Sequence, residues 1–480
     1  MLYILVLIPV AGALAAWFIR SNRIRPMVMP VVALFHLAIA LPLSLYRSES
    51  TGSDWIMIDP IGGVVLITLS LLFACCSIYA VKYLIDDRPE RPNRVICLSL
   101  LLSLSSMSLA CISQHMGLLW VSVATSTVAM APLIYFNRNP RSIEAAWKYL
   151  MIGSVGIGLA LLGLYFLAYA TLVAGNDATL MLQDLVRIAP NLDQGWLKAA
   201  FIFLLAGFGT KLGLAPMHTW KPDAYGETPG VVGALLAGAL TNCTFLALLR
   251  VYQVVSAAGL DERFYRYPLI VLGLLSMGFA AAFLARQVDF KRMLAYSSVE
   301  HVGILALALG IGKGALFGMM LHLVGNGLSK GALFLSSGTL HRIYGGKGTA
   351  GMHGALRRLP WSGSIFLAGF LAVSAFPPFI PFLSEFSIAV AAFNQENWYI
   401  GVIFLLLLAL VFLGMAPTVM EILLGAPPAN LPSSIHRESF MNVVPPLVLL
   451  ILVLVLGIWM PAPFANLLKE SAEILSGGCK

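Results

Sequence analysis

Long apolar runs are the feature that most limits how this chain can fold. Runs of roughly 20 residues, enough helix to cross a hydrocarbon core about 30 Å thick, recur along almost all of the 480 residues. Hydrophobic residues make up 59% of the chain and charged residues 11%, whereas soluble domains are about half apolar and about a quarter charged. The sequence therefore predicts an all-α polytopic membrane protein embedded in the lipid bilayer, with no room for a separate soluble domain.

The apolar runs and the breaks between them predict about fourteen transmembrane helices. The predicted helices cover residues 1–19, 27–46, 60–83, 96–112, 116–136, 146–174, 197–217, 229–255, 267–285, 294–311, 314–341, 362–391, 398–422 and 441–461.

Basic residues indicate how these helices are oriented. With this division, 19 Lys and Arg residues lie in the loops that follow odd-numbered helices, against 9 in the other loops and tails. The positive-inside rule then places both termini outside the cytoplasmic membrane of a bacterium or archaeon. The formal charge of +8 does not indicate nucleic-acid binding, because the basic residues form short clusters between apolar runs rather than one face.

Two segments carry prolines at membrane depth, GTKLGLAPMHTWKPDA (209–224) and SAFPPFIPFLSEFS (374–387). A proline-interrupted helix frees backbone groups that only neighbouring protein or water can satisfy, so we expect helices 7 and 12 to be broken toward the bundle interior. Five helices separate the breaks, which predicts two inverted five-helix repeats. The alternative is an ordinary proline kink in each helix.

The chain then divides into four parts. Residues 1–95 form helices 1–3, residues 96–255 the first repeat, residues 267–422 the second repeat, and residues 441–480 the last helix with its tail.

Few ionisable residues remain near the middle of the predicted helices. They are Lys211, His322, Lys330 and Glu385, with Glu300 and His301 nearer to the start of a helix. A charge at the bilayer centre costs at least about 2.5 kcal/mol on insertion scales, so it normally faces a partner or a water path. Each repeat has one charge beside its break, since Lys211 precedes Pro216 and Glu385 follows Pro381.

The predicted helix 314–341 carries a polar stripe. His322, Asn326 and Lys330 are spaced i, i+4, i+8, which places them on one helix face. Because burial can move the pKa of a titratable group by several units, such a row suits a proton relay. A buried polar ladder that only joins helices is the alternative. His218 and His301 are further candidates for a water path, whereas Lys221 and Asp223 are expected to anchor helix ends.

No cofactor is expected from the motifs. The six cysteines show no CxxC or Cys/His ligand spacing, and we find no metal motif, nucleophilic triad or paired catalytic carboxylates. The sequence therefore predicts neither a metal site nor a redox centre in this chain.

Several phrases resemble a known family. They are SIEAAWKYL (142–150), KLGLAPMHTWKPDAYGETP (211–229), DFKRMLAYSSVEHVGI (289–304), HLVGNGLSKGALFLSSG (322–338) and PPFIPFLSEF (377–386). In this order they resemble the antiporter-like proton-channel subunits of complex I, Mrp antiporters and membrane-bound hydrogenases, with the nearest likeness to component F of hydrogenase 4. The resemblance implies a proton path through Lys211, Lys330 and Glu385.

Three departures from the family pattern bear on this path. The family's fifth-span glutamate, which pairs with the seventh-span lysine, is matched here by Ala124. The eighth span offers Asn242 and two threonines in place of a titratable bridging residue, and Gly327 stands where a histidine is often found. The resemblance therefore implies that the first half-channel is electrostatically impaired.

The resulting hypothesis is a non-redox, proton-translocating subunit of a hydrogenase- or complex I-related oxidoreductase complex. Its implied partners are other membrane subunits and a peripheral redox arm, which would carry the electron transfer. Two alternatives stay open: a proton-flux membrane subunit of an inorganic-carbon uptake complex, and a scaffold subunit that has lost transport.

Overall fold

The structure is a computed structural model that describes residues 2–46, 53–87, 93–285, 287–346, 348, 351–394, 398–425 and 438–477. The described residues form helices joined by turns and loops, without named strands among them. This is the expected result in lipid, because a helix satisfies its own backbone hydrogen bonds where water is absent.

Eleven helical stretches of the described chain are long and apolar enough to cross a membrane. They are α2 (Val28–Leu45), α3 (Pro60–Asp87), α4 (Arg94–Ile112), α5 (Met116–Ile134), α6 (Pro140–Val173), α8 (Gln194–Leu212), the continuous run of α10 (Gly230–Ala234), a π-helical turn (Leu235–Leu240) and α11 (Thr241–Ala257), α12 (Glu262–Leu284), α13 (Phe290–Ile311), α18 (Tyr399–Leu424) and α19 (Phe440–Ile458). Shorter apolar helices are α1 (Leu2–Phe18), α16 (Pro360–Val373) and α17 (Ile380–Phe393). The longer and more polar α14 spans Leu316–Tyr344.

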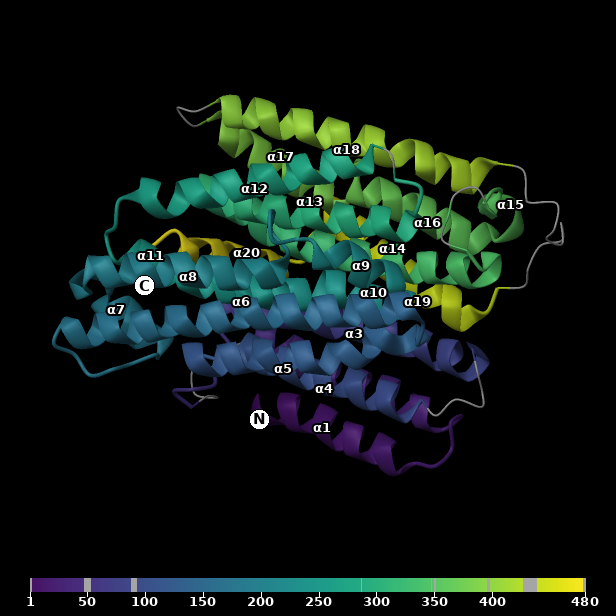
Figure 1. The fold of residues 1–480 in the computed structure, drawn as a ribbon, viewed down its shortest axis with the longest axis horizontal. Helices are drawn as coiled ribbons and strands as arrows, with labels where there is room; N and C mark the ends of the chain where they lie inside the picture. The colour runs from purple at the N-terminus through teal and green to yellow at the C-terminus, as the bar shows by residue number, and fades with distance from the viewer. Residues whose placement is uncertain are drawn as a thin grey trace.

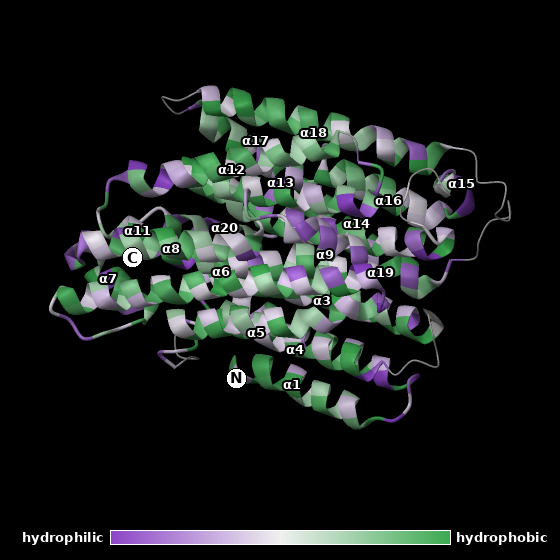
Figure 2. Ribbon diagram, in the orientation of Figure 1, coloured by the Kyte–Doolittle hydropathy of each residue, from purple (hydrophilic) through white to green (hydrophobic). Residues whose placement is uncertain are grey.

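The long helices lie roughly side by side along one axis, and most loops gather at the two ends of the bundle (Figure 1). Helix α14 lies inside the bundle, where it contacts α3, α13, α16, α17 and α19. Its side chains are buried on every side from Gly318 to Leu340. Outer helices such as α1 and α18 instead expose large apolar side chains, and their ribbons are mostly green, the colour of hydrophobic residues (Figure 2). The centre of the bundle can therefore hold polar groups that lipid would not tolerate.

Both predicted breaks are present. The predicted helix 197–217 ends early, at Leu212, and the chain turns before it continues as α9 (Trp220–Glu227). The predicted helix 362–391 is two helices, α16 and α17, separated by residues 374–379. The chain between the helices carries Pro216 in the first case and Pro377 and Pro378 in the second, and proline has no amide hydrogen to donate to a helical ladder. The count of fourteen spans and the inverted repeats remain predictions.

Some elements escape the apolar pattern. Besides α9, these are α7 (Leu182–Ile188), α15 (Ala355–Arg358) and α20 (Ala462–Leu475). The predicted C-terminal tail contains α20, which buries Phe464, Leu467 and Leu468 and packs against α3 and α14. It is amphipathic rather than continuously apolar, so a search for apolar runs does not find it.

A buried ion pair joins two distant parts of the bundle. Arg250 on α11 donates two hydrogen bonds to the carboxylate of Asp59, directly before α3, at 2.6 and 2.5 Å. The Arg250 side chain is 1% exposed and that of Asp59 13%. With little water nearby, each charge depends on the other for its solvation.

Truncation of this pair is expected to destabilise the fold strongly. Arg250→Ala leaves the Asp59 carboxylate without its bidentate partner, which for buried pairs costs about 3–5 kcal/mol. Thermal unfolding of the purified chain in detergent measures the loss. Arg187→Ala is the matched control, because Arg187 pairs with Asp184 at the surface and should change stability by less than about 1 kcal/mol. Equal effects of the two substitutions would contradict a structural role for the buried pair.

Candidate functional site

The first break is shaped by Gly213, which follows α8. Gly213 has φ +72°, a left-handed conformation that glycine adopts without strain, and its amide caps the end of the helix. A Cβ atom at this position would lie 2.6 Å from Cδ of Lys221. The glycine therefore both ends α8 and leaves room for the buried lysine side chain to pass.

Lys211 lies in the last turn of α8 and is 3% exposed. Its Nζ donates a hydrogen bond to the hydroxyl of Tyr149 on α6 at 2.8 Å and lies 4.3 Å from the centre of that ring. Among the described residues no carboxylate forms an ion pair with Lys211. Its hydrogen-bond partner is thus a phenol on α6 and not the fifth-span acid that the family resemblance leads one to expect.

Asp223 on α9 anchors the segment after the break, as predicted. It accepts from Lys148 of α6 at 2.7 Å and from Arg292 of α13 at 2.5 Å. Lys148 also pairs with Glu144 one turn earlier on α6. These contacts fix α9 between two helices of the bundle.

Lys221 differs from the sequence-based expectation of a helix-end anchor. Its side chain is 0% exposed, and its Nζ has no hydrogen-bond partner among the described residues. The ammonium lies 5.9 Å from the ring centre of Tyr225 and interacts electrostatically with Lys330. Its burial could not be predicted from the sequence, because Lys221 follows the end of the predicted helix 197–217.

His218 lies among aromatic rings rather than beside another histidine or a carboxylate. The nearest ring centres are those of Phe279, Phe283 and Tyr296, at 5.3, 6.4 and 6.4 Å. His218 is 5% exposed, and its Nδ1 has no hydrogen-bond partner among the described residues. It is therefore close to the first break but outside the cluster at the second break.

The second break brings together three of the predicted residues. His301 of α13 and His322 of α14 face each other, with Nδ1 of the first 3.1 Å from Nε2 of the second. Nδ1 of His322 lies 3.0 Å from the hydroxyl of Ser384 and 3.9 Å from a carboxylate oxygen of Glu385, both on α17. Since all four side chains are at most 5% exposed, this is a buried polar chain across three helices.

Lys330 extends the cluster on the next turns of α14. Its Nζ donates to the hydroxyl of Ser297 on α13 at 2.5 Å. Glu300, one turn further along α13, interacts with Ser297 and electrostatically with both Lys330 and Glu385. From the sequence, Glu300 is evident only as a residue near a helix start, because periodicity cannot show that its helix face meets α14 and α17.

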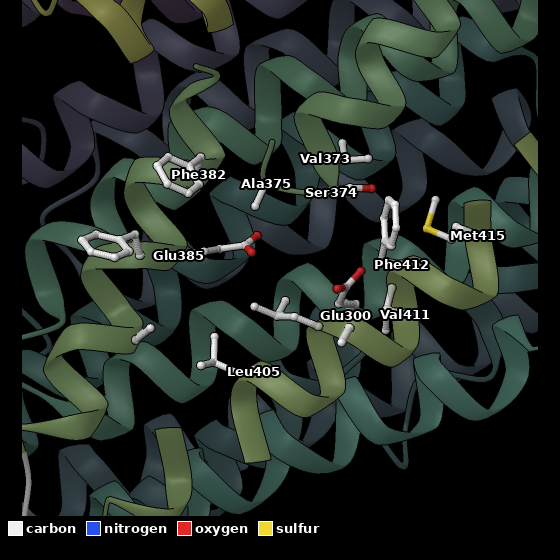
Figure 3. A pocket seen from close by; sticks show the side chains of 14 residues that line it. Glu300, Val373, Ser374, Ala375, Phe382, Glu385, Leu405, Val411, Phe412 and Met415 are labelled. Atoms are coloured by element: carbon white, nitrogen blue, oxygen red, sulfur yellow. The ribbon is translucent and has the colours of Figure 1, made fainter. Parts of the chain in front are cut away.

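A cavity of about 310 Å³ opens beside these acids. Glu300 and Glu385 direct their carboxylates into it, while Phe382, Phe412 and Met415 form part of its apolar lining (Figure 3). The arrangement gives two buried carboxylates access to a space large enough for water.

The departures at Asn242 and Gly327 have a packing reason. A Cβ atom on Gly327 would lie 2.9 Å from the amide nitrogen of Asn242, which donates to the Leu323 carbonyl of α14. A Cβ atom on Gly238 would lie 2.7 Å from the carbonyl oxygen of Gly327. Two helices therefore meet backbone to backbone here, leaving no room for a histidine at position 327.

Comparison with known proteins decides the family. Residues 113–411 match the family described as NADH:quinone oxidoreductase/Mrp antiporter, transmembrane. This chain belongs to that family. The matched region of this family member contains Lys211, His301, His322, Lys330 and Glu385.

Individual relatives agree with this assignment. The chain is 32% identical to a hydrogenase-4 component F homolog of Methylacidiphilum infernorum, over 82% of this chain and 83% of the relative. It is also 32% identical to NADH-quinone oxidoreductase subunit N of Desulforudis audaxviator, over 75% and 73%. The resemblance inferred from the sequence is thereby confirmed.

The fold of this family member also matches a solved structure. It aligns with a chain of the membrane-bound sulfane sulfur reductase, an archaeal respiratory membrane complex, with a TM-score of 0.86 and 19% identity. The alignment covers 99% of this chain and 97% of the other. The likeness shows a shared fold along nearly the full length.

Proposed function

We infer that this chain is a proton-translocating, non-redox subunit of a membrane complex related to hydrogenases and complex I. Other membrane subunits and a peripheral redox arm are its proposed partners. The chain moves protons while the partner subunits carry out electron transfer.

One observation carries this proposal: titratable and hydroxyl side chains form a buried cluster around the second break. One part of the cluster runs from Glu385 on α17 through His322 on α14 to His301 on α13. The other part runs from Lys330 on α14 to Ser297 and Glu300 on α13. Charged groups inside a membrane bundle are costly, so a cluster of them beside a cavity favours a pathway over simple packing. The proton path therefore runs mainly through this second half.

The first half is proposed to be impaired. Lys211 hydrogen-bonds a phenol instead of an acid, and Ala124 cannot supply a carboxylate. An opposite charge within about 4–6 Å would stabilise the charged lysine and let it take part in coupled charge transfer. These features of the first half also support the alternative of a transport-inactive scaffold. The intact second half argues against that alternative.

Proton pumping by the assembled complex tests the function. The complex that copurifies with the chain is placed in closed vesicles, and turnover of its redox subunits should produce a pH gradient that an uncoupler abolishes. Identification of the copurifying subunits distinguishes a hydrogenase-like complex from an inorganic-carbon uptake complex. Turnover at full rate with no gradient in tight vesicles would favour the scaffold.

A further inference from the structure

Three side chains at the second break offer more than a path for protons. His301, His322 and Glu385 come from α13, α14 and α17, and one ligand atom from each lies within 4.8 Å of the others. Their exposed fractions are 0%, 0% and 5%. Two imidazoles and a carboxylate are a ligand set that zinc uses in proteins.

The two rings are spaced for a metal. Two Zn–N bonds of about 2.0–2.1 Å at a tetrahedral angle place their nitrogens about 3.3 Å apart. Nδ1 of His301 and Nε2 of His322 lie 3.1 Å apart. The spacing of the two nitrogens is therefore within a few tenths of an ångström of the spacing in a metal site.

Hydrogen bonding leaves the inward nitrogen of His322 available. The Ser384 hydroxyl donates to the Pro381 carbonyl at 2.8 Å, so it accepts from Nδ1–H of His322 at 3.0 Å. That tautomer leaves a lone pair on Nε2, which points at His301. A serine that holds the outer nitrogen is the kind of support that orients a histidine ligand.

Oε1 of the third ligand, Glu385, lies 3.9 Å from Nδ1 of His322 but accepts no hydrogen bond from it. Oε1 of Glu385 is buried without a hydrogen-bond partner among the described residues, and so is Nε2 of His301. The backbone of Val373 lies beside the His301 ring, although no hydrogen bond of normal geometry forms there. When a metal replaces the proton between the rings, that proton can move to the free Nε2.

A cavity lies beside Glu385, the third ligand. It has a volume of about 310 Å³ and also exposes the carboxylate of Glu300 (Figure 3). The negative charges of Glu300 and Glu385 offset most of the positive charge of a divalent cation and the Lys330 ammonium. Three protein ligands leave one position of a tetrahedral zinc shell for water.

We propose that His301, His322 and Glu385 bind Zn²⁺, and that the bound ion blocks proton transfer through the second half of the bundle. The block rests on the proposed function, because it assumes that protons pass these three side chains. Binding of Zn²⁺ to these three side chains does not depend on the proposed function.

Cobalt binding tests the site without any transport assay. Co²⁺ is added to the purified full-length chain in detergent, and tetrahedral coordination should give saturable visible absorption bands at one ion per chain, which Zn²⁺ then removes. His301→Gln should weaken Co²⁺ binding at least about tenfold. Glu385→Gln, which keeps the side-chain shape, should change the bands even if His301→Gln fails to fold.

His36→Gln is the matched control. His36 is 1% exposed like the cluster histidines, but its two ring nitrogens contact the hydroxyls of Ser108 and Ser70. Its replacement should leave the Co²⁺ spectrum unchanged. Absence of saturable bands in the unaltered chain, or equal bands after Glu385→Gln, would overturn the site.

A second arm adds Zn²⁺ to the vesicle assay. Loss of the pH gradient at Zn²⁺ concentrations that fill the site supports the block. Cobalt binding with an unaffected gradient would refute the block and place the proton path elsewhere. A zinc-insensitive gradient without cobalt binding would refute the metal site while the proposed function stands.

Discussion

Glu385→Gln should reduce the pH gradient formed per turnover by about 100-fold, while the complex still assembles. The amide keeps the shape of the side chain but cannot carry the proton, and a positioned acid–base group typically contributes at least that factor. Glu385 is suited to this role because it faces His322 at 3.9 Å and also lines the cavity. The measurement is gradient formation in vesicles, with redox turnover recorded in the same sample.

Glu144→Gln is the control for this substitution. Glu144 is an acid on the exposed start of α6, where its side chain is 63% exposed and pairs with Lys148. Its removal should change the gradient less than about twofold, because a surface pair contributes little. An unchanged gradient per turnover in the Glu385→Gln complex would show that protons do not need this carboxylate.

Lys330→Met should have an effect of similar size, about 100-fold. Methionine fills much of the volume of the lysine stem but has no proton to exchange, so the connection from α14 to Ser297 and Glu300 is lost. Since Lys330 is 0% exposed, water cannot replace its ammonium group readily. Retention of the complex on size-exclusion chromatography separates a loss of transfer from a loss of folding.

The comparison with Lys211→Met tests whether the two halves are unequal. Lys211 contacts Tyr149 and, among the described residues, has no acidic partner, so its replacement should cost clearly less than that of Lys330. If Lys211→Met abolishes the gradient as completely as Lys330→Met does, both halves carry protons, and the proposal that the first half is impaired is wrong.

The sequence by itself determined the membrane class, most helix positions and both breaks. These follow from local physics: apolar run length is set by bilayer thickness, and a proline lacks the amide hydrogen that a continuing helix uses. Lys211, Lys330 and Glu385 were identifiable for the same reason, since a charge in an apolar run stands out without knowledge of its neighbours.

Only the tertiary structure decided which of these residues meet. The polar stripe on α14 did not show which helix it faces, and only the structure pairs His322 with His301 and Lys330 with Ser297 of α13. In a membrane the contact faces are chosen by small residues and polar pairs, as where Gly238 meets Gly327. The burial of Lys221, hidden in a stretch that reads as a loop, likewise depends on how α9 packs between α6 and α13.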